Sequence, residues 1–265
     1  MIDIKTRDGQ ILVATLSGNP ASARRVALVH SLAMDRTFWS PIVREIGDEA
    51  HVLSYDCRGH GKSSRPAGPY SVGQFADDLA DVLDHVGWDR AVVAGASMGG
   101  TVALAFAAAY PNRVTGLGLF DTTAWYGEDA PLRWEERADK AMSEGLQSLV
   151  GFQKTRWFSD AFREQHPDAV NACVATFLGN GLDAYAATCR MLGTADLRGA
   201  LPSLTMPTRI GVGDEDYATP PAMAEALHRA IAGSTLTVFK GARHLTPLEI
   251  PQRVADEIRR LWAGC

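Results

Sequence analysis

Short, continuous apolar runs alternate with longer amphipathic stretches in the first half of the chain. The runs cover residues 26–29, 52–55, 91–94 and 117–120, and apolar residues at helical spacing lie between them, around residues 38–46 and 72–86. Runs that are apolar on both faces are typical of buried parallel strands, and their alternation with helices indicates βαβ crossovers. The pattern therefore predicts an α/β protein with a mostly parallel, doubly wound sheet.

Both ends of the chain add strands to this sheet. Residues 2–6 and 10–16 read as an antiparallel hairpin whose turn is Asp8-Gly9. Near the other end, the pattern predicts a strand at 208–212, a helix that begins near Pro220-Pro221, a strand at 235–239 and a closing helix at 251–262.

The middle of the chain differs from both halves of the predicted sheet. Residues 122–200 read as helical or irregular, are rich in Trp, Phe and Arg, and contain no strand-like run. We interpret them as an inserted helical cap on a core formed by residues 1–121 and 201–265. A chain of 265 residues suits one catalytic unit of this kind.

Composition narrows the classes of partner and compartment. With 46% hydrophobic residues, 22% charged residues and a net charge of −5, the chain has the core of a globular protein and no basic footprint for nucleic acid or an anionic membrane. Residues 1–10 do not resemble a signal peptide, so we expect a cytoplasmic protein. The four cysteines lack metal or redox spacing and are expected to be reduced, with no metal site: Cys57, Cys173, Cys189 and Cys265.

The strongest chemical signal is Gly95-Ala96-Ser97-Met98-Gly99, between a buried strand and a helical stretch. It fits the pattern G-x-S-x-G, in which a sharp turn exposes a nucleophilic serine at the end of a sheet strand. The alternative is a strand–helix turn whose serine only caps the helix.

Partners for such a serine occur in the expected order of acid and then histidine. His244 follows the strand at 235–239 and is the candidate general base, whereas His51, His85, His166 and His228 are expected to be surface or core residues. The loop after the strand at 208–212 offers three carboxylates, and the residues alone do not choose among them: Asp214, Glu215 and Asp216.

Several further segments resemble the α/β-hydrolase superfamily: residues 30–32, the D-x-R-G-H-G segment at 56–63, and residues 95–100 and 241–244. Within it, the chain is similar to 3-oxoadipate enol-lactonases. This similarity rests on Gly68-Pro69-Tyr70-Ser71, Arg156-Trp157-Phe158 with Phe162, and His244-Leu245 followed by Glu249.

The resemblance implies roles for individual residues. The family's acid motif, followed by Thr-Pro-Pro, corresponds to Asp216 ahead of residues 219–221, and the oxyanion hole corresponds to the backbone N–H groups of Leu32 and Met98. Structural roles are implied for Asp56, Arg58 and His60. The chain departs from the family at Ala33, where the family has glycine, and at Gly193, where it tends to have arginine, with Arg190 nearby.

Together these residues predict a serine hydrolase that cleaves a small lactone or carboxylic ester without a cofactor, as an enol-lactonase acting on 3-oxoadipate enol-lactone or a related compound. Trp125, Trp134, Arg137 and Trp157 are expected to line the substrate pocket, with core packing as the alternative for the aromatic residues. A substrate carboxylate would be held by a cap arginine, and the candidates are Arg133, Arg137, Arg156 and Arg190.

Other functions remain open on the same fold. A carboxylesterase, a carbon–carbon bond hydrolase and a perhydrolase would use the same three catalytic groups, and a non-catalytic ligand-binding member is a further alternative. The sequence leaves the oligomeric state open.

Overall fold

A single mixed sheet organises the computed structural model, which describes residues 1–262. Its order is β1-β2-β4-β3-β5-β6-β7-β8; β2 runs antiparallel to β1 and β4, and the remaining pairs are parallel. The predicted hairpin and doubly wound sheet are thus confirmed. The strands are β1 (Ile2–Lys5), β2 (Ile11–Gly18), β3 (Arg25–Val29), β4 (His51–Tyr55), β5 (Ala91–Ala96), β6 (Val114–Phe120), β7 (Thr208–Gly213) and β8 (Thr235–Phe239).

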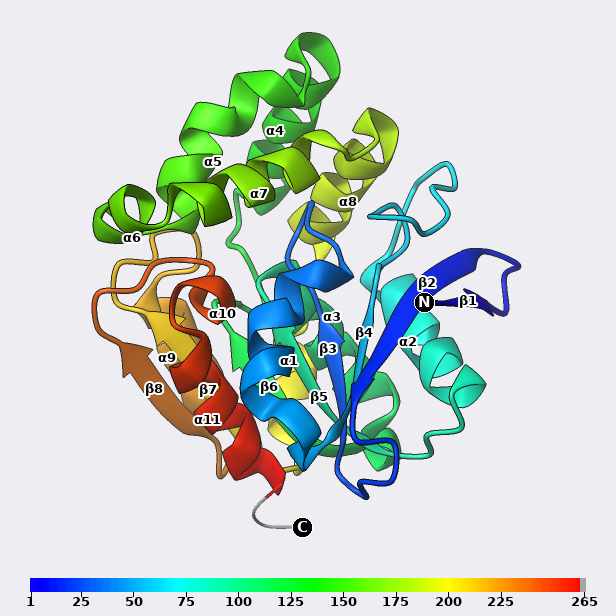
Figure 1. Cartoon of the computed structure of the whole chain (residues 1–265). Helices are drawn as coiled ribbons and strands as arrows, with labels where there is room; N and C mark the ends of the chain where they lie inside the picture. Colours follow the sequence, from blue (N-terminus) through cyan, green and yellow to red (C-terminus); the bar gives the residue numbers. More distant parts are fainter. Residues whose placement is uncertain (263–265) are drawn as a thin grey trace.

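Helices cover both faces of this sheet. In Figure 1, α1 (Ser40–Ile46) and α11 (Pro251–Trp262) lie in front of the strands, and α3 (Met98–Ala109) lies behind them, where it packs against α2 (Val72–His85). The closing helix α11 is held by an apolar stripe in which Val254, Ile258 and Leu261 are fully buried, as their helical spacing predicts. Helix α9 (Pro221–Ala230) connects β7 to β8, and α10 (Thr246–Glu249) precedes α11.

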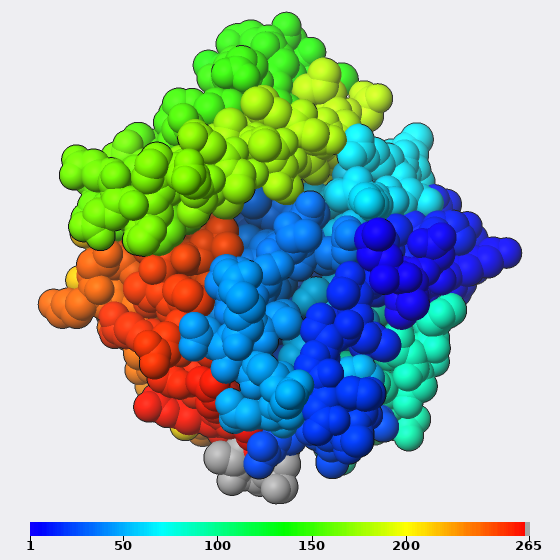
Figure 2. Space-filling view, in the orientation of Figure 1, coloured from blue at the N-terminus to red at the C-terminus, as the bar shows by residue number. Residues whose placement is uncertain are grey.

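Five helices form the insertion, which lies as a separate lobe across the carboxyl ends of the strands (Figures 1 and 2). An isolated antiparallel bridge between Trp125 and Asp196 closes its base, and the N–H of Leu197 donates to the carbonyl of Ala124 at 2.9 Å. The helices are α4 (Ala130–Glu144), α5 (Val150–Trp157), α6 (Asp160–Gln165), α7 (Pro167–Leu178) and α8 (Leu182–Thr194).

Close packing of α4 against α8 explains the glycine at position 193. A Cβ on Gly193 would lie 3.0 Å from the Cβ of Trp134 and 3.2 Å from the carbonyl oxygen of Ala130. A long side chain there would push the two helices apart, so this departure from the enol-lactonase pattern is built into the cap.

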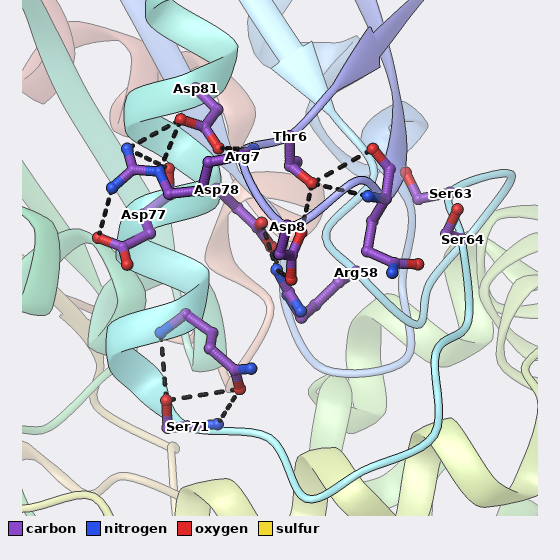
Figure 3. Close-up of polar contacts among 12 residues, drawn as sticks. Thr6, Arg7, Asp8, Arg58, Ser63, Ser64, Ser71, Asp77, Asp78 and Asp81 are labelled. Carbon is purple, nitrogen blue, oxygen red and sulfur yellow. Dashed lines mark hydrogen bonds and ion pairs between the residues drawn. The ribbon is translucent and has the colours of Figure 1, made fainter.

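The D-x-R-G-H-G loop after β4 fixes the N-terminal hairpin to α2, as Figure 3 shows. The guanidinium of Arg58 donates to Asp78 on α2 at 2.6 and 2.7 Å, and to Asp8 in the β1–β2 turn at 3.0 Å. Asp56 pairs with Arg36 at 2.7 Å. Asp56 and Arg58 thus pair with residues outside the catalytic centre, which fits the structural role implied for the loop.

Two properties of the described chain bear on its surroundings. Among residues 1–262, no helix is both long and apolar enough to cross a membrane. Cys57, Cys173 and Cys189 are buried free thiols, and Cys265 lies outside the described residues.

Candidate active site

Ser97 occupies a sharp turn between β5, which ends at Ala96, and α3, which begins at Met98. Its φ of 53° lies in the left-handed region, where a residue with a side chain is strained. A Cβ on Gly95 would lie 2.0 Å from the carbonyl oxygen of Gly99, and one on Gly99 would lie 2.0 Å from that of Val29. Both glycines are therefore required for the strand and helix to approach this closely.

A chain of hydrogen bonds joins Ser97 to the predicted base and acid. His244 Nε2 lies 2.9 Å from Ser97 Oγ, and His244 Nδ1 lies 2.8 Å from Asp216 Oδ2. Burial opposes the charge of Asp216, but the imidazole and the donors of Thr219 outweigh it and lower the pKa of this carboxyl. An ionised Asp216 binds a proton on Nδ1 and leaves Nε2 free to accept the serine proton.

Each of the three carboxylates in the acid loop has a different partner. Asp214 accepts from the backbone N–H of Gly241 at 2.7 Å, and Glu215 pairs with Arg243 at 2.9 Å. Only Asp216 contacts the imidazole. Its other oxygen accepts from the N–H groups of Ala218 and Thr219 at 2.7 and 3.0 Å, which fixes its orientation.

The two predicted oxyanion donors flank the serine. Leu32 lines the hollow at Ser97, and Met98 is the first residue of α3. In the described part of the chain, neither backbone N–H donates to a main-chain carbonyl. Next to Leu32, Ala33 takes a φ of 59°, which favours glycine, and its carbonyl accepts from the cap residue Asn180 at 2.8 Å. This bond stabilises the loop despite the alanine.

Asp121 is a buried acid at this site that the sequence did not single out. It follows β6 directly, and its carboxylate accepts from the N–H and hydroxyl of Thr246 at 3.0 and 2.6 Å and from the N–H of Gly213 at 3.3 Å. Burial raises the pKa of Asp121 well above its usual value, and the charge of Asp216 raises it further. An acid placed directly after a buried strand, between the strands that carry Ser97 and the acid loop, was the available signal.

The cap covers the serine with side chains from α4 and α5. A hollow of about 20 Å³ beside Ser97 is lined on the cap side by predicted residues, Trp134, Arg137 and Trp157, together with Arg156. Tyr126 and Gln153 line it too and were not expected from the sequence.

The end of α5 holds the loop that carries the base. The carbonyl of Trp157 accepts from the N–H groups of His244 and Leu245 at 3.1 and 3.0 Å. Glu249 accepts from the N–H groups of Arg243 and Ser159 at 2.8 and 3.0 Å, which joins the same loop to the cap. Trp157 and Glu249 thus position His244 through backbone contacts.

Arg137 and Arg156 bring two positive charges to the hollow without a carboxylate partner. Arg137 donates to the hydroxyl of Tyr185 at 2.7 Å and stacks on Trp134, and neither arginine forms an ion pair with any residue between 1 and 262. Desolvation and the neighbouring charge of Arg137 lower the pKa of Arg156 to about 10. An anion bound between them would relieve this repulsion.

The structure places two of the predicted residues away from the serine. Trp125 is at the base of the insertion, where it stacks with Arg198 at 3.7 Å, and it lines a cavity of about 520 Å³ that Ser97 does not line. Arg190 is bound to Glu135 through two nitrogens on the outer surface of the cap. Trp125 thus does not line the hollow at Ser97, contrary to expectation, and of the four candidate cap arginines Arg190 is the one that lines neither this hollow nor the cavity beside it.

Comparisons with known proteins place the chain in a family. The family model described as the alpha/beta hydrolase fold matches residues 24–167. 3-Oxoadipate enol-lactonase 2 of Acinetobacter baylyi is 33% identical to the chain, over 87% of this chain and 86% of that protein. The chain belongs to the α/β-hydrolase family and is a hydrolase, as its motifs predict.

Solved structures agree with this assignment over almost the full chain. The enol-lactonase from Burkholderia xenovorans LB400 is 30% identical and superposes with a TM-score of 0.94, over 99% of this chain and all of that one. A thermophilic esterase from Thermogutta terrifontis, solved with malate bound, is 32% identical with a TM-score of 0.92, over 99% and 98% of the two chains.

Proposed function

We propose that this protein is a serine hydrolase that opens a small, carboxylate-bearing enol-lactone, 3-oxoadipate enol-lactone or a related compound, through an acyl-enzyme on Ser97. The observation that carries the proposal is the hydrogen-bonded chain from Asp216 through His244 to Ser97. It lies beneath a cap that brings to the same hollow two arginines with no ion-pair partner among residues 1–262. The enol-lactonases among the relatives support the substrate class.

In the first half of the reaction, Ser97 Oγ attacks the lactone carbonyl while His244 Nε2 takes its proton. The N–H groups of Leu32 and Met98 stabilise the tetrahedral oxyanion. The bond from the carbonyl carbon to the ring oxygen then breaks, and Nε2 returns the proton to that oxygen. Because the ring is closed through this bond, the leaving enol stays attached to the acyl chain and tautomerises to a ketone.

In the second half, water attacks the acyl-enzyme with His244 as the base, and Ser97 takes back its proton as the free acid leaves. Asp216 holds the proton on Nδ1 and stabilises the imidazolium in both halves. The chain's own side chains and backbone thus supply the nucleophile, the base and the oxyanion donors.

The substrate's charge is inferred from Arg137 and Arg156. A lactone of 3-oxoadipate keeps one free carboxylate, because only one of its two carboxyl groups closes the ring. Two neighbouring guanidinium groups that have no acidic partner among residues 1–262 suit such an anion, since arginine binds carboxylates through two parallel hydrogen bonds. Malate, bound in the related esterase, is itself a dicarboxylate.

The test compares kcat/KM for a carboxylate-bearing lactone with kcat/KM for its neutral methyl ester. We expect the native protein to favour the anion, and Arg137→Gln and Arg156→Gln each to reduce that preference by about tenfold or more, the loss of a charge-assisted hydrogen bond. A native preference for the neutral ester that neither variant alters would support a general carboxylesterase instead.

A further inference from the structure

The hollow at Ser97 is too small for the body of a substrate. Its volume of about 20 Å³ accommodates little more than one water molecule. A second cavity of about 280 Å³ adjoins it, and the two share a wall of four residues: Tyr126, Trp134, Arg137 and Arg156. The arginine pair inferred to bind the substrate carboxylate therefore faces both spaces.

The larger cavity lies between the cap and the core. On the cap side it is bounded by α4, including Arg133, and on the core side by Tyr217, Pro220 and Met223, which follow the catalytic acid and begin α9. The side chain of Arg133 is 73% exposed, and Tyr217 is 51% exposed, so both mark the outer end of the cavity.

Charge along this cavity has a single sign. Three arginines line it, Arg133, Arg137 and Arg156, and none of its lining residues is acidic. Arg133 pairs at 2.7 Å with Asp129, which is half-exposed and does not line the cavity. An exposed ion pair of this kind is weak, so Arg133 remains able to attract an anion. The cavity thus offers positive charge in a chain whose net charge is −5.

From these features we infer that the 280 Å³ cavity is the entrance and outer subsite for the anionic substrate, with Arg133 attracting the carboxylate at the mouth and Met223 limiting the width. The inference rests on the proposed function and extends it to a route and to two residues outside the catalytic centre. A net negative protein repels an anion at long range, so attraction must be local, within a Debye length of about 8 Å at physiological salt.

The charge at the mouth is tested with Arg133→Gln and, as a matched control, Arg190→Gln, a cap arginine that does not line the cavity. At low ionic strength, Arg133→Gln is expected to raise KM for the carboxylate-bearing lactone about threefold or more, with kcat unchanged, and this difference should shrink in high salt. Arg190→Gln should leave KM unchanged, and neither variant should alter KM for the neutral ester.

The width is tested with Met223→Trp against Ala222→Trp, because Met223 lines both the 280 Å³ cavity and the cavity near Trp125, whereas its exposed neighbour Ala222 lines only the latter. The measurement is the rate at which small and bulky fluorophosphonates label Ser97, together with lactone turnover. Met223→Trp should slow labelling by the bulky probe at least fivefold relative to the small one, whereas Ala222→Trp should match the native protein.

The outcomes separate the two proposals. If neither Arg133→Gln nor Met223→Trp changes the labelling or the lactone turnover of the native protein, the entrance is overturned and the hydrolase proposal stands. Labelling that responds to Met223→Trp without any native lactone turnover would support the entrance and overturn the enol-lactonase proposal. Failure of the native protein to be labelled or to turn over any ester would overturn both.

Discussion

The carboxylate of Asp121 binds both donors of Thr246, accepting the backbone N–H at 3.0 Å and the hydroxyl at 2.6 Å. Thr246 lies two residues after His244, so this contact fixes the loop that carries the base. The adjacent Thr122 donates its hydroxyl to the carbonyl of Ser97 at 2.7 Å, and Asp121 also accepts from Gly213 before the acid loop. The end of β6 thereby connects the loops that carry all three catalytic groups.

Asp121 is expected to act as a positioning residue. Asp121→Ala leaves the N–H groups of Thr246 and Gly213 without their acceptor, so His244 should lose alignment with Ser97. We expect kcat to fall about 10- to 100-fold, with KM within about twofold of native, because the substrate contacts remain. Steady-state kinetics with thermal unfolding measures this, and partial rescue by Asp121→Asn is expected. An unchanged kcat in a folded Ala variant would contradict the role.

Substitution of neighbouring acids tests the assignment of Asp216. Asp216→Asn keeps the size of the side chain but no longer fixes the proton on Nδ1 of His244, so kcat should fall by about 10⁴-fold. Asp214→Asn should have a mild effect, since the carboxylate of Asp214 accepts from the N–H of Gly241 and does not contact His244. If Asp214→Asn proved the more damaging of the two, the acid would be misassigned.

The pH dependence of stability should report the carboxyl of Asp216. The lowered pKa of Asp216 means that its contribution to stability is present above its unfolded pKa near 4 and is lost only as pH falls further. Urea unfolding of the native protein and of Asp216→Asn measures this contribution, and we expect the difference in their free energies of unfolding to shrink as pH falls below about 4. A difference that stays constant as pH falls would contradict an ionised Asp216 in the folded protein.

The pair formed by Arg58 and Asp78 is expected to stabilise the fold, with no part in catalysis. Asp78→Ala leaves a buried guanidinium with only Asp8 as its partner, and we expect a loss of about 3 kcal/mol in the free energy of unfolding. Its neighbour Asp77 pairs with Arg7 at the surface, so Asp77→Ala should cost less than about 1 kcal/mol. Urea unfolding compares them, and equal losses would show that burial of the pair does not matter.

The core could be predicted from the sequence because its elements have strong local signals. Buried parallel strands appear as continuous apolar runs, and the turn at Ser97 requires glycines at fixed positions. Both can therefore be recognised in the sequence without tertiary information. The choice of Asp216 among three neighbouring acids needed the family resemblance, since local sequence does not say which one contacts His244.

The residues of the cap that face the active site could not be predicted as well, because the buried faces of the cap helices are defined only once the cap folds over the core. Arg133 and Arg137 lie four residues apart on one face of α4, and both line the cavity of about 280 Å³. Arg190 on α8 instead pairs with Glu135 at the surface of the cap. Trp125 is a tryptophan like Trp134, but it lies at the base of the insertion and does not line the hollow at Ser97. Helical spacing shows which residues share a face of a helix, but it does not show which face lies over Ser97.

Covalent labelling of the native protein by a fluorophosphonate, located by peptide mass spectrometry, tests the acyl-enzyme mechanism most directly. The predicted result is a single adduct on Ser97 that is absent in Ser97→Ala and forms at least 100-fold more slowly in His244→Ala, because the serine loses its base. An adduct on another residue, or lactone turnover that survives in Ser97→Ala at the native rate, would contradict the mechanism.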